Sequence, residues 1–128
     1  MPALIRKVDT ARRVGGEVVV WGTGMPRREF LYVDDCADAC VHLMKTYSDD
    51  GHVNVGSGED IAIADLTRLV MEVLDYDGPV VNDLSKPDGT PRKLMDVSRL
   101  TGLGWSASTP LRDGIKRSYE AYLAGQHR

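Results

Sequence analysis

The stretch VVVWGTGMPRREFLYVDD, residues 18–35, decides the fold that this sequence predicts. It contains two runs typical of strands, residues 18–22 and 28–33, joined by a turn with two glycines and a proline. An unbroken β-branched run such as Val18–Val20 favours a strand that is covered on both faces. We therefore predict a hairpin here, with Trp21 and Arg28 close to its turn.

Helices are predicted on both sides of this hairpin. Residues 2–14 place apolar side chains along one face, and Gly15-Gly16 ends the run. A second helix is expected over about 35–47, capped by Asp34 or Asp35, because a carboxylate there accepts unpaired backbone N–H groups.

The rest of the chain alternates strands and helices. HVNV, residues 52–55, predicts a third strand, and Val80 and Val81 lie in a fourth. Apolar residues between Ile63 and Leu74 follow the i, i+3, i+4, i+7 spacing of an amphipathic helix.

A short helix is expected near residues 96–102, before a last helix capped by Thr109 with Pro110 at its first position. The predicted class is α/β, with small mixed sheet elements, about four to five helices and a single domain over residues 1–128.

Composition indicates an ordinary globular chain. The 128 residues are 42% hydrophobic and 27% charged, and a chain of this size buries roughly two-thirds of its unfolded surface. No apolar run approaches the ~20 residues of a membrane span, and MPALIRKV is too short and too charged for a secretory signal. Cys36 and Cys40 are expected to be small buried residues in a reducing compartment. We therefore expect a cytoplasmic protein without a membrane partner.

Charge is distributed unevenly along the sequence. Residues 1–28 carry a net +4, residues 29–85 a net −11 and residues 86–128 a net +4. A nucleic-acid binder needs a continuous basic stripe, and the acidic middle argues against one. A pocket between the two basic ends would favour a small anion.

No catalytic constellation is visible. The sequence has no dinucleotide-binding glycine fingerprint, no Tyr-x-x-x-Lys pair and no second Cys/His pair at metal-ligand spacing. His42, His52 and His127 have no adjacent nucleophile, so structural or surface roles are expected for them. We predict neither catalytic nor metal-ligating residues in this chain.

Arg28 and Trp21 are the first candidates for ligand recognition. Arg28 lies at the boundary between a turn and a strand, where its guanidinium fork suits two phosphate oxygens. The alternative is an ordinary surface arginine, or one paired with Glu29. Trp21 could stack against a nucleobase, although a strand tryptophan is more often part of a core.

The loop KPDGTPRK, residues 86–93, is the second candidate. Asp88 could accept hydrogens from hydroxyl or amine groups, while Lys86, Arg92 and Lys93 could meet phosphate. The alternative is a solvated charged loop.

Four stretches together carry a resemblance to a known family: WGTGMPRREFLYVDDCADA, HVNVGSGED, SKPDGTPRKLMDVSRLTGLGW and PLRDGI. They resemble the C-terminal part of the GDP-L-fucose synthases, a branch of the extended short-chain dehydrogenase/reductase (NAD-dependent epimerase/dehydratase) family. The general pattern occurs across that family, whereas KPDGTPRKLMD together with VVVWG is much more specific for this branch.

The resemblance implies an activity for a complete family enzyme. Such an enzyme converts GDP-4-keto-6-deoxy-D-mannose to GDP-L-fucose, by 3,5-epimerisation and then NADPH-dependent reduction. Its NADP-binding Rossmann domain, Tyr-x-x-x-Lys pair and epimerising Cys and His lie N-terminal to the matching region. The resemblance therefore implies a substrate-binding domain without the cofactor domain, holding no cofactor itself and inactive alone.

Five site residues carry over from the family motifs. The resemblance implies contacts to a GDP-sugar from Lys7, Trp21, Arg28, Asp88 and Lys93, with Arg28 at the diphosphate. The sequence departs from the family at one helix start. The helix after the GSG turn usually begins with Thr or Ser in the family, whereas this sequence has Ala62 at that position.

Two other readings remain open. The chain could be a free-standing module that binds a nucleotide-sugar without chemistry. It could also be an orphan product that self-associates through an apolar surface meant for the cofactor domain. The expected partners are thus a GDP-sugar and a second copy of the chain, with no nucleic acid.

Overall fold

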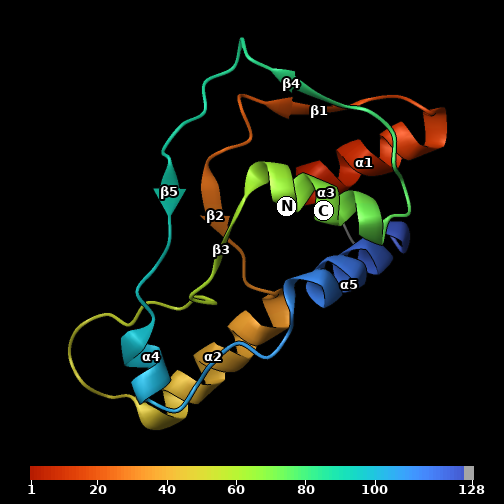
Figure 1. Ribbon diagram of the computed structural model, residues 1–128. Coiled ribbons are helices and arrows are strands. Elements are labelled where there is room, and N and C mark those ends of the chain that lie inside the picture. The colour runs from red at the N-terminus through yellow and green to blue at the C-terminus, as the bar shows by residue number, and fades with distance from the viewer. Residues whose placement is uncertain (126–128) are drawn as a thin grey trace.

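The structure is a computed structural model that describes residues 1–125, so the predicted surface residue His127 lies outside it (Figure 1). The helices are α1 (Pro2–Val14), α2 (Val33–Thr46), α3 (Ile63–Val73), α4 (Ser98–Gly102) and α5 (Leu111–Leu123). The strands are β1 (Val18–Trp21), β2 (Arg27–Glu29), β3 (Asp60–Ala62), β4 (Val80–Asp83) and β5 (Arg92–Lys93). The predicted mixed α/β class with small sheets is confirmed.

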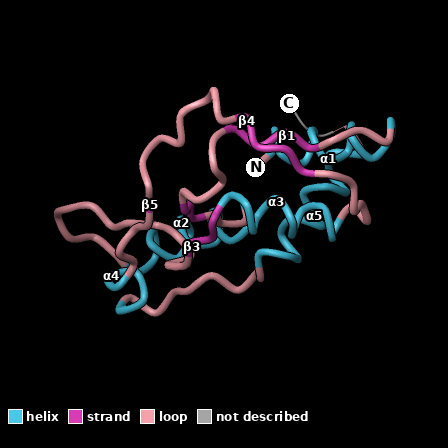
Figure 2. The backbone as a smooth tube through the Cα atoms, turned by 45° about the horizontal axis from the view of Figure 1, so that its top comes forward, coloured by secondary structure: helices cyan, strands magenta, loops and turns pink. Residues whose placement is uncertain are grey.

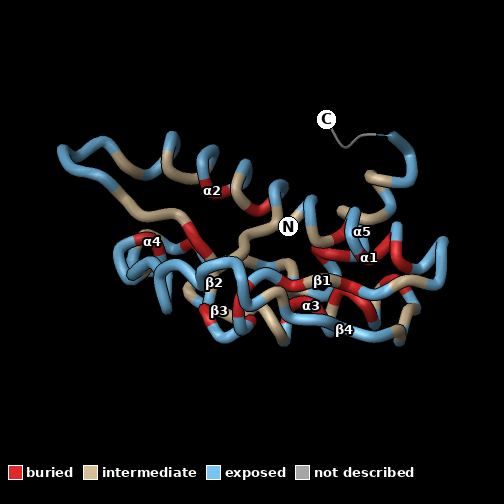
Figure 3. The backbone as a smooth tube through the Cα atoms, turned by 90° about the horizontal axis from the view of Figure 1, so that it is seen from above, coloured by how far each residue is buried: buried red, intermediate tan, exposed pale blue. Residues whose placement is uncertain are grey.

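Helices α1, α3 and α5 pack together and bury the main core. Figure 3 shows the buried positions gathered in these helices and in β1 beside them. The amphipathic helix predicted from its apolar spacing is confirmed as α3, whose Leu66 and Val70 are fully buried. Helix α1 ends as predicted at Gly15, which has φ +69°, a left-handed conformation that glycine adopts without steric cost. The core residues are Ile5, Val8, Ala11, Val18, Leu66, Val70, Met71, Leu74 and Ile115.

The predicted hairpin is wrong. Strand β1 pairs in parallel with β4, and the two run side by side in Figure 2, whereas β2 pairs with β3 and β5. The turn between β1 and β2 is bonded to the start of α3 instead: Ala64 N donates to Gly24 O at 2.9 Å, and Ile63 N donates to Pro26 O at 3.0 Å. These bonds occupy the turn's carbonyls and direct β2 into a separate sheet.

Two further strand predictions are also wrong. Residues 30–32 are irregular and α2 begins at Val33, so the second strand of the opening stretch is much shorter than expected. Residues 52–55 have no ladder partner within residues 1–125, and strand pairing is what defines a strand. Val53 and Val55 instead pack on a second, smaller core.

That second core lies between α2, α4 and the segment after α4. Its buried residues are Ala39, Leu100 and Trp105, and Trp105 Nε1 donates a 2.9 Å hydrogen bond to an Asp38 oxygen. Cys36 on the same helix is half-buried and Cys40 is exposed, so the prediction that both are buried is wrong.

The predicted helix caps are replaced by a longer-range contact. The N-caps of α2 and α5 are Tyr32 and Pro110, and neither cap makes a side-chain hydrogen bond. Asp35 instead accepts four hydrogen bonds, from the backbone N–H and hydroxyl groups of Ser108 and Thr109, at 2.9–3.3 Å. This contact joins α2 to the entrance of α5. Ala62 is the N-cap of α3, at the position where the sequence departs from the family pattern.

Among the helices of residues 1–125, none combines the length and apolar character that a membrane crossing requires.

Asp35 makes a specific pH dependence testable. Burial alone would raise the pKa of this carboxyl, but the hydrogen bonds from Thr109 and Ser108 outweigh it and hold the pKa below its usual value. The stabilisation that the Asp35 carboxylate gives to the fold is therefore complete above about pH 4. It is lost as the pH falls through the pKa of Asp35 in the folded chain. Asp35→Asn should lower the free energy of unfolding by about 1–3 kcal/mol at neutral pH.

Urea denaturation at neutral and acidic pH measures this effect. The gap between Asp35→Asn and the unmodified chain should narrow in acid, because the unmodified carboxyl then protonates as well. The exposed neighbour Asp34 provides the control, and Asp34→Asn should change stability by less than about 1 kcal/mol. Equal losses from both substitutions would contradict the assigned role of Asp35.

Candidate functional site: a basic surface around Trp21

Trp21 ends β1 and is 61% exposed, which excludes the alternative that it belongs to the core. Two ammonium groups lie over the ring. Lys7 Nζ, from α1, is 5.1 Å from the ring centroid, and Lys86 Nζ, from the loop after β4, is 5.2 Å away. Lys7 Nζ also donates a 3.2 Å hydrogen bond to Val19 O, which ties α1 to β1. Lysines from the two basic parts of the sequence, residues 1–28 and 86–128, thus meet at one aromatic ring.

Asp88 ties the loop between β4 and β5 to the turn after β1. Its two carboxylate oxygens accept hydrogen bonds from Thr23 N at 2.6 Å and Thr23 Oγ1 at 2.8 Å. Gly22 makes this approach possible: it has φ +73°, and a Cβ there would lie 2.1 Å from Asp88 Oδ1. The predicted site residue Asp88 therefore holds two loops together, next to the Trp21 ring.

Arg28 and Lys93 are brought together by the pairing of β2 with β5. The two strands run parallel, with Arg27 opposite Arg92 and Arg28 opposite Lys93. Because successive side chains of a strand point to opposite faces, Arg27 and Arg92 share one face while Arg28 and Lys93 share the other. The five predicted site residues thus come from α1, β1, β2, β5 and one connecting loop.

Asp60 neutralises the face that carries Arg27 and Arg92. Its oxygens accept hydrogen bonds from Arg27 Nε at 3.0 Å and Arg92 Nε at 2.6 Å, and its side chain is only 6% exposed. Burial alone would raise the pKa of the Asp60 carboxyl, but the hydrogen bonds and charges of Arg92 and Arg27 outweigh it and lower the pKa. Arg92 is therefore a structural residue in this fold.

The other face has no such carboxylate. Arg28 Nη1 donates to Arg27 O at 2.7 Å, and neither Arg28 nor Lys93 makes an ion pair within the described part of the chain. The alternative pairing of Arg28 with Glu29 is not formed. Glu29 instead accepts from Gly58 N at 2.6 Å and from Met95 N at 3.1 Å. Uncompensated cations at an element boundary are suited to an anionic ligand.

The sequence reasoning missed the residues that hold this surface in place. Glu29 lies against the GSG turn so closely that a Cβ on Gly56 would be 2.5 Å from Glu29 Oε2. The glycines of that turn are thus required by packing. No spacing rule links Glu29 or Asp60 to its distant partners, so only the tertiary structure reveals their roles.

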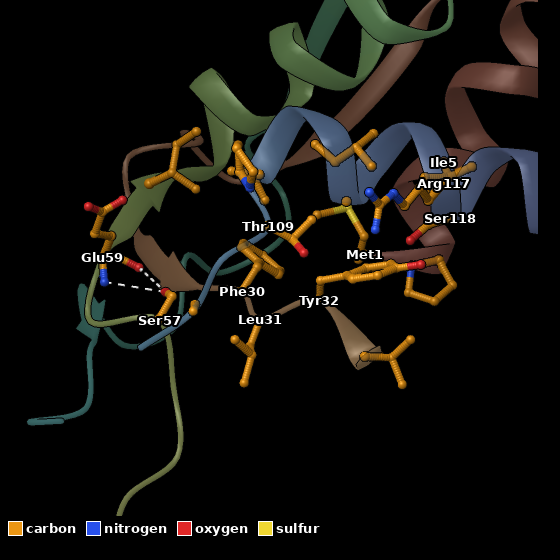
Figure 4. Close-up of a pocket in the computed structure, with 18 of the residues that line it drawn as sticks. Met1, Ile5, Phe30, Leu31, Tyr32, Ser57, Glu59, Thr109, Arg117 and Ser118 are labelled. Atoms are coloured by element: carbon orange, nitrogen blue, oxygen red, sulfur yellow. Dashed lines mark hydrogen bonds between the residues drawn. The ribbon is translucent and has the colours of Figure 1, made fainter. Parts of the chain in front are cut away.

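A cavity of about 870 Å³ lies elsewhere, between the segment after β2, the start of α1 and one side of α5 (Figure 4). Most of its lining is apolar, including Ile5, Phe30 and Leu31, with Arg117 against the Tyr32 ring at 5.6 Å. None of the five predicted site residues lines it. An apolar hollow does not match the anionic part of the expected ligand, so we place the candidate site at Trp21.

Residues 1–125 contain no group of three or more His, Cys, Asp or Glu side chains arranged to hold a metal ion.

Known proteins with similar sequences give this surface a context. The profile of the NAD dependent epimerase/dehydratase family matches residues 1–56. GDP-L-fucose synthase 1 of Arabidopsis thaliana is 54% identical over 124 residues, which make up 96% of this chain and 38% of the plant protein. The chain resembles the GDP-L-fucose synthases. GDP-L-fucose synthase of Escherichia coli (strain K12) is 44% identical, with matches over all of this chain and 43% of that protein.

A solved GDP-L-fucose synthetase has the same fold over this region. It comes from Naegleria fowleri with NADP bound, is 27% identical and has a TM-score of 0.90. The alignment covers 97% of this chain and 40% of that one. The chain therefore spans about two-fifths of the length of the GDP-L-fucose synthases that it matches.

The close approach at Gly22 predicts a loss of stability on adding one methyl group. Gly22→Ala places a Cβ against Asp88 in a left-handed backbone conformation, which should lower the free energy of unfolding by about 1–3 kcal/mol. Urea denaturation followed by circular dichroism measures this free energy of unfolding. Gly102→Ala is the matched control, because a Cβ there meets nothing within 4 Å, and the change should stay within about 0.5 kcal/mol. Equal effects would contradict the close approach.

Proposed function

We propose that this chain is the GDP-sugar substrate-binding part, over residues 1–128, of a GDP-L-fucose synthase. The complete enzyme would convert GDP-4-keto-6-deoxy-D-mannose to GDP-L-fucose with NADPH. Two observations carry the proposal: an exposed Trp21 lies beside two ammonium groups, and Arg28 and Lys93 share a strand face and make no ion pair among residues 1–125. Similarity to GDP-L-fucose synthases supports it.

Each side chain has a defined role in this proposal. The Trp21 ring would stack the guanine base, an interaction worth about 1–3 kcal/mol. Arg28 would hold two diphosphate oxygens with its guanidinium fork, and charge-assisted bonds of this kind contribute about 1.5–3 kcal/mol each. Lys7 and Lys93 would add positive charge on either side, with Asp88 close to the nucleotide.

The hydride transfer and epimerisation are proposed to use residues outside this chain. The 128 residues contain neither the glycine fingerprint that cradles a dinucleotide nor a Tyr-x-x-x-Lys pair. NADP is accordingly proposed as the cofactor of the complete enzyme, and this chain contributes recognition of the substrate.

Calorimetric titration with GDP tests the proposal. Arg28→Ala should raise the Kd for GDP by about tenfold to a hundredfold, because it removes charge-assisted bonds to the diphosphate. Added salt should weaken binding to the unmodified chain. The same sample should not oxidise NADPH with the keto-sugar, so binding is the correct readout.

Arg68→Ala is the control, because Arg68 is an exposed arginine on α3 whose loss removes the same charge. It should leave the Kd unchanged. If the unmodified chain does not bind GDP, the proposed function is wrong.

Exposed apolar side chains on α2 favour self-association of the isolated chain as a second candidate property. Val33, Val41 and Met44 are 68%, 48% and 85% exposed, and their spacing along the helix puts them on one side. We expect light scattering to show a dimer, because apolar surface of this kind is buried in most soluble proteins. Met44→Lys should shift the sample toward monomer, and a monomeric unmodified chain would remove this prediction.

A further inference from the structure

Lys86 occupies a fixed place in the loop between β4 and β5. Its backbone N–H donates to Asp83 O at 3.2 Å, which closes a turn directly after β4. Two residues further on, Asp88 is bonded to Thr23 through both carboxylate oxygens. The loop is therefore anchored on each side of Lys86. These two anchors place the Lys86 side chain over Trp21, with Nζ 5.2 Å from the ring centroid.

The Lys86 ammonium has no hydrogen bond or ion pair among residues 1–125. Asp83, its neighbour at the end of β4, uses one carboxylate oxygen to accept from Ser85 N at 3.1 Å and from Ser85 Oγ at 2.5 Å. Among residues 1–125, Lys86 contacts the Trp21 ring, through an attraction that is weak at an exposed site, and its charge also attracts the nearby Asp83 carboxylate. No hydrogen bond holds the ammonium in either interaction, so it can move to an anion.

Two ammonium groups over one ring also oppose each other. Lys7 Nζ lies 5.1 Å from the same centroid, and like charges brought together raise the electrostatic energy of the free protein. An anion bound close to either ammonium would reduce this repulsion. A planar base stacked on Trp21 would take the position of an ammonium, and the flexible four-carbon stem of lysine lets that ammonium move.

We propose that Lys86 is a further contact to the diphosphate of a nucleoside diphosphate whose base stacks on Trp21. In the free protein its ammonium lies over the ring, and on binding it moves to the phosphate oxygens. The Thr23–Asp88 contact is what keeps the loop, and therefore Lys86, within reach. This inference rests on the proposed function and adds a cation to the family-derived residues Lys7, Arg28 and Lys93.

Three variants test the role of Lys86 by calorimetry with GDP and with guanosine. Lys86→Gln keeps the length and the hydrogen-bonding end of the side chain but removes its charge, and should raise the Kd for GDP about three- to tenfold. The dependence of that Kd on salt should become shallower. Lys86→Arg should restore binding to within about twofold, because the charge returns. Guanosine binding should not weaken, since guanosine has no phosphate for Lys86 to contact.

Lys116→Gln is the matched control for the lost charge, because Lys116 is an exposed lysine on α5. It should bind GDP like the unmodified chain. If the unmodified chain and the Lys86→Gln variant bind GDP equally well, the proposed contact of Lys86 with phosphate is wrong, while the proposed function stands. Equal weakening of GDP and guanosine would also overturn the phosphate contact. Absence of GDP binding by every variant and by the unmodified chain would overturn both proposals.

Discussion

The buried carboxylate of Asp60 is the interaction on which the candidate site depends. It receives Arg27 from β2 and Arg92 from β5, and so fixes the parallel pairing of two very short strands. A strand pair of this length has few ladder bonds, so a charged side-chain contact contributes much of what holds its register. The same contact determines which cations are left without a partner. Arg28 and Lys93 point to the opposite face because side chains alternate along a strand.

The long connection from β4 to β5 follows from this arrangement. Strand β4 pairs with β1 in one sheet, and β5 pairs with β2 in the other. The connection between β4 and β5 therefore passes the turn that joins β1 to β2. Figure 1 shows it as the long green-to-teal arc at the edge of the molecule. The Thr23–Asp88 hydrogen bonds and the close approach to Gly22 hold it at that crossing. The same loop also approaches Arg28, because a Cβ on Gly89 would lie 3.7 Å from Arg28 Nη2.

Helix α2 is attached to the rest of the structure by polar contacts as well as by the second apolar core. Asp35 holds the entrance of α5, and Asp38 holds the indole of Trp105. The second core that these contacts enclose is small, and its valines at 53 and 55 lie in a segment without strand partners in the part described. The exposed apolar side of α2 is the surface for which self-association is proposed.

The sequence by itself determined the helices and the residues of the candidate site. Apolar spacing predicted α3, and Gly15 predicted the end of α1, because these signals act within a few residues. The motifs around Trp21, Arg28 and KPDGTPRK indicated a GDP-sugar surface by resemblance.

Strand pairing was decided only by tertiary structure. The glycine-rich turn after Trp21 bonds to α3 across a long sequence separation, which no local pattern reveals. Apart from the family resemblance, nothing in the sequence distinguishes Arg27 from Arg28, or Arg92 from Lys93, because only the distant carboxylate of Asp60 neutralises one of each pair. Asp35 and Thr109, which the sequence predicted as helix caps, are hydrogen-bonded to each other instead. A buried carboxylate gains more from several converging donors than from one local N–H group, and only the tertiary structure brings those donors together.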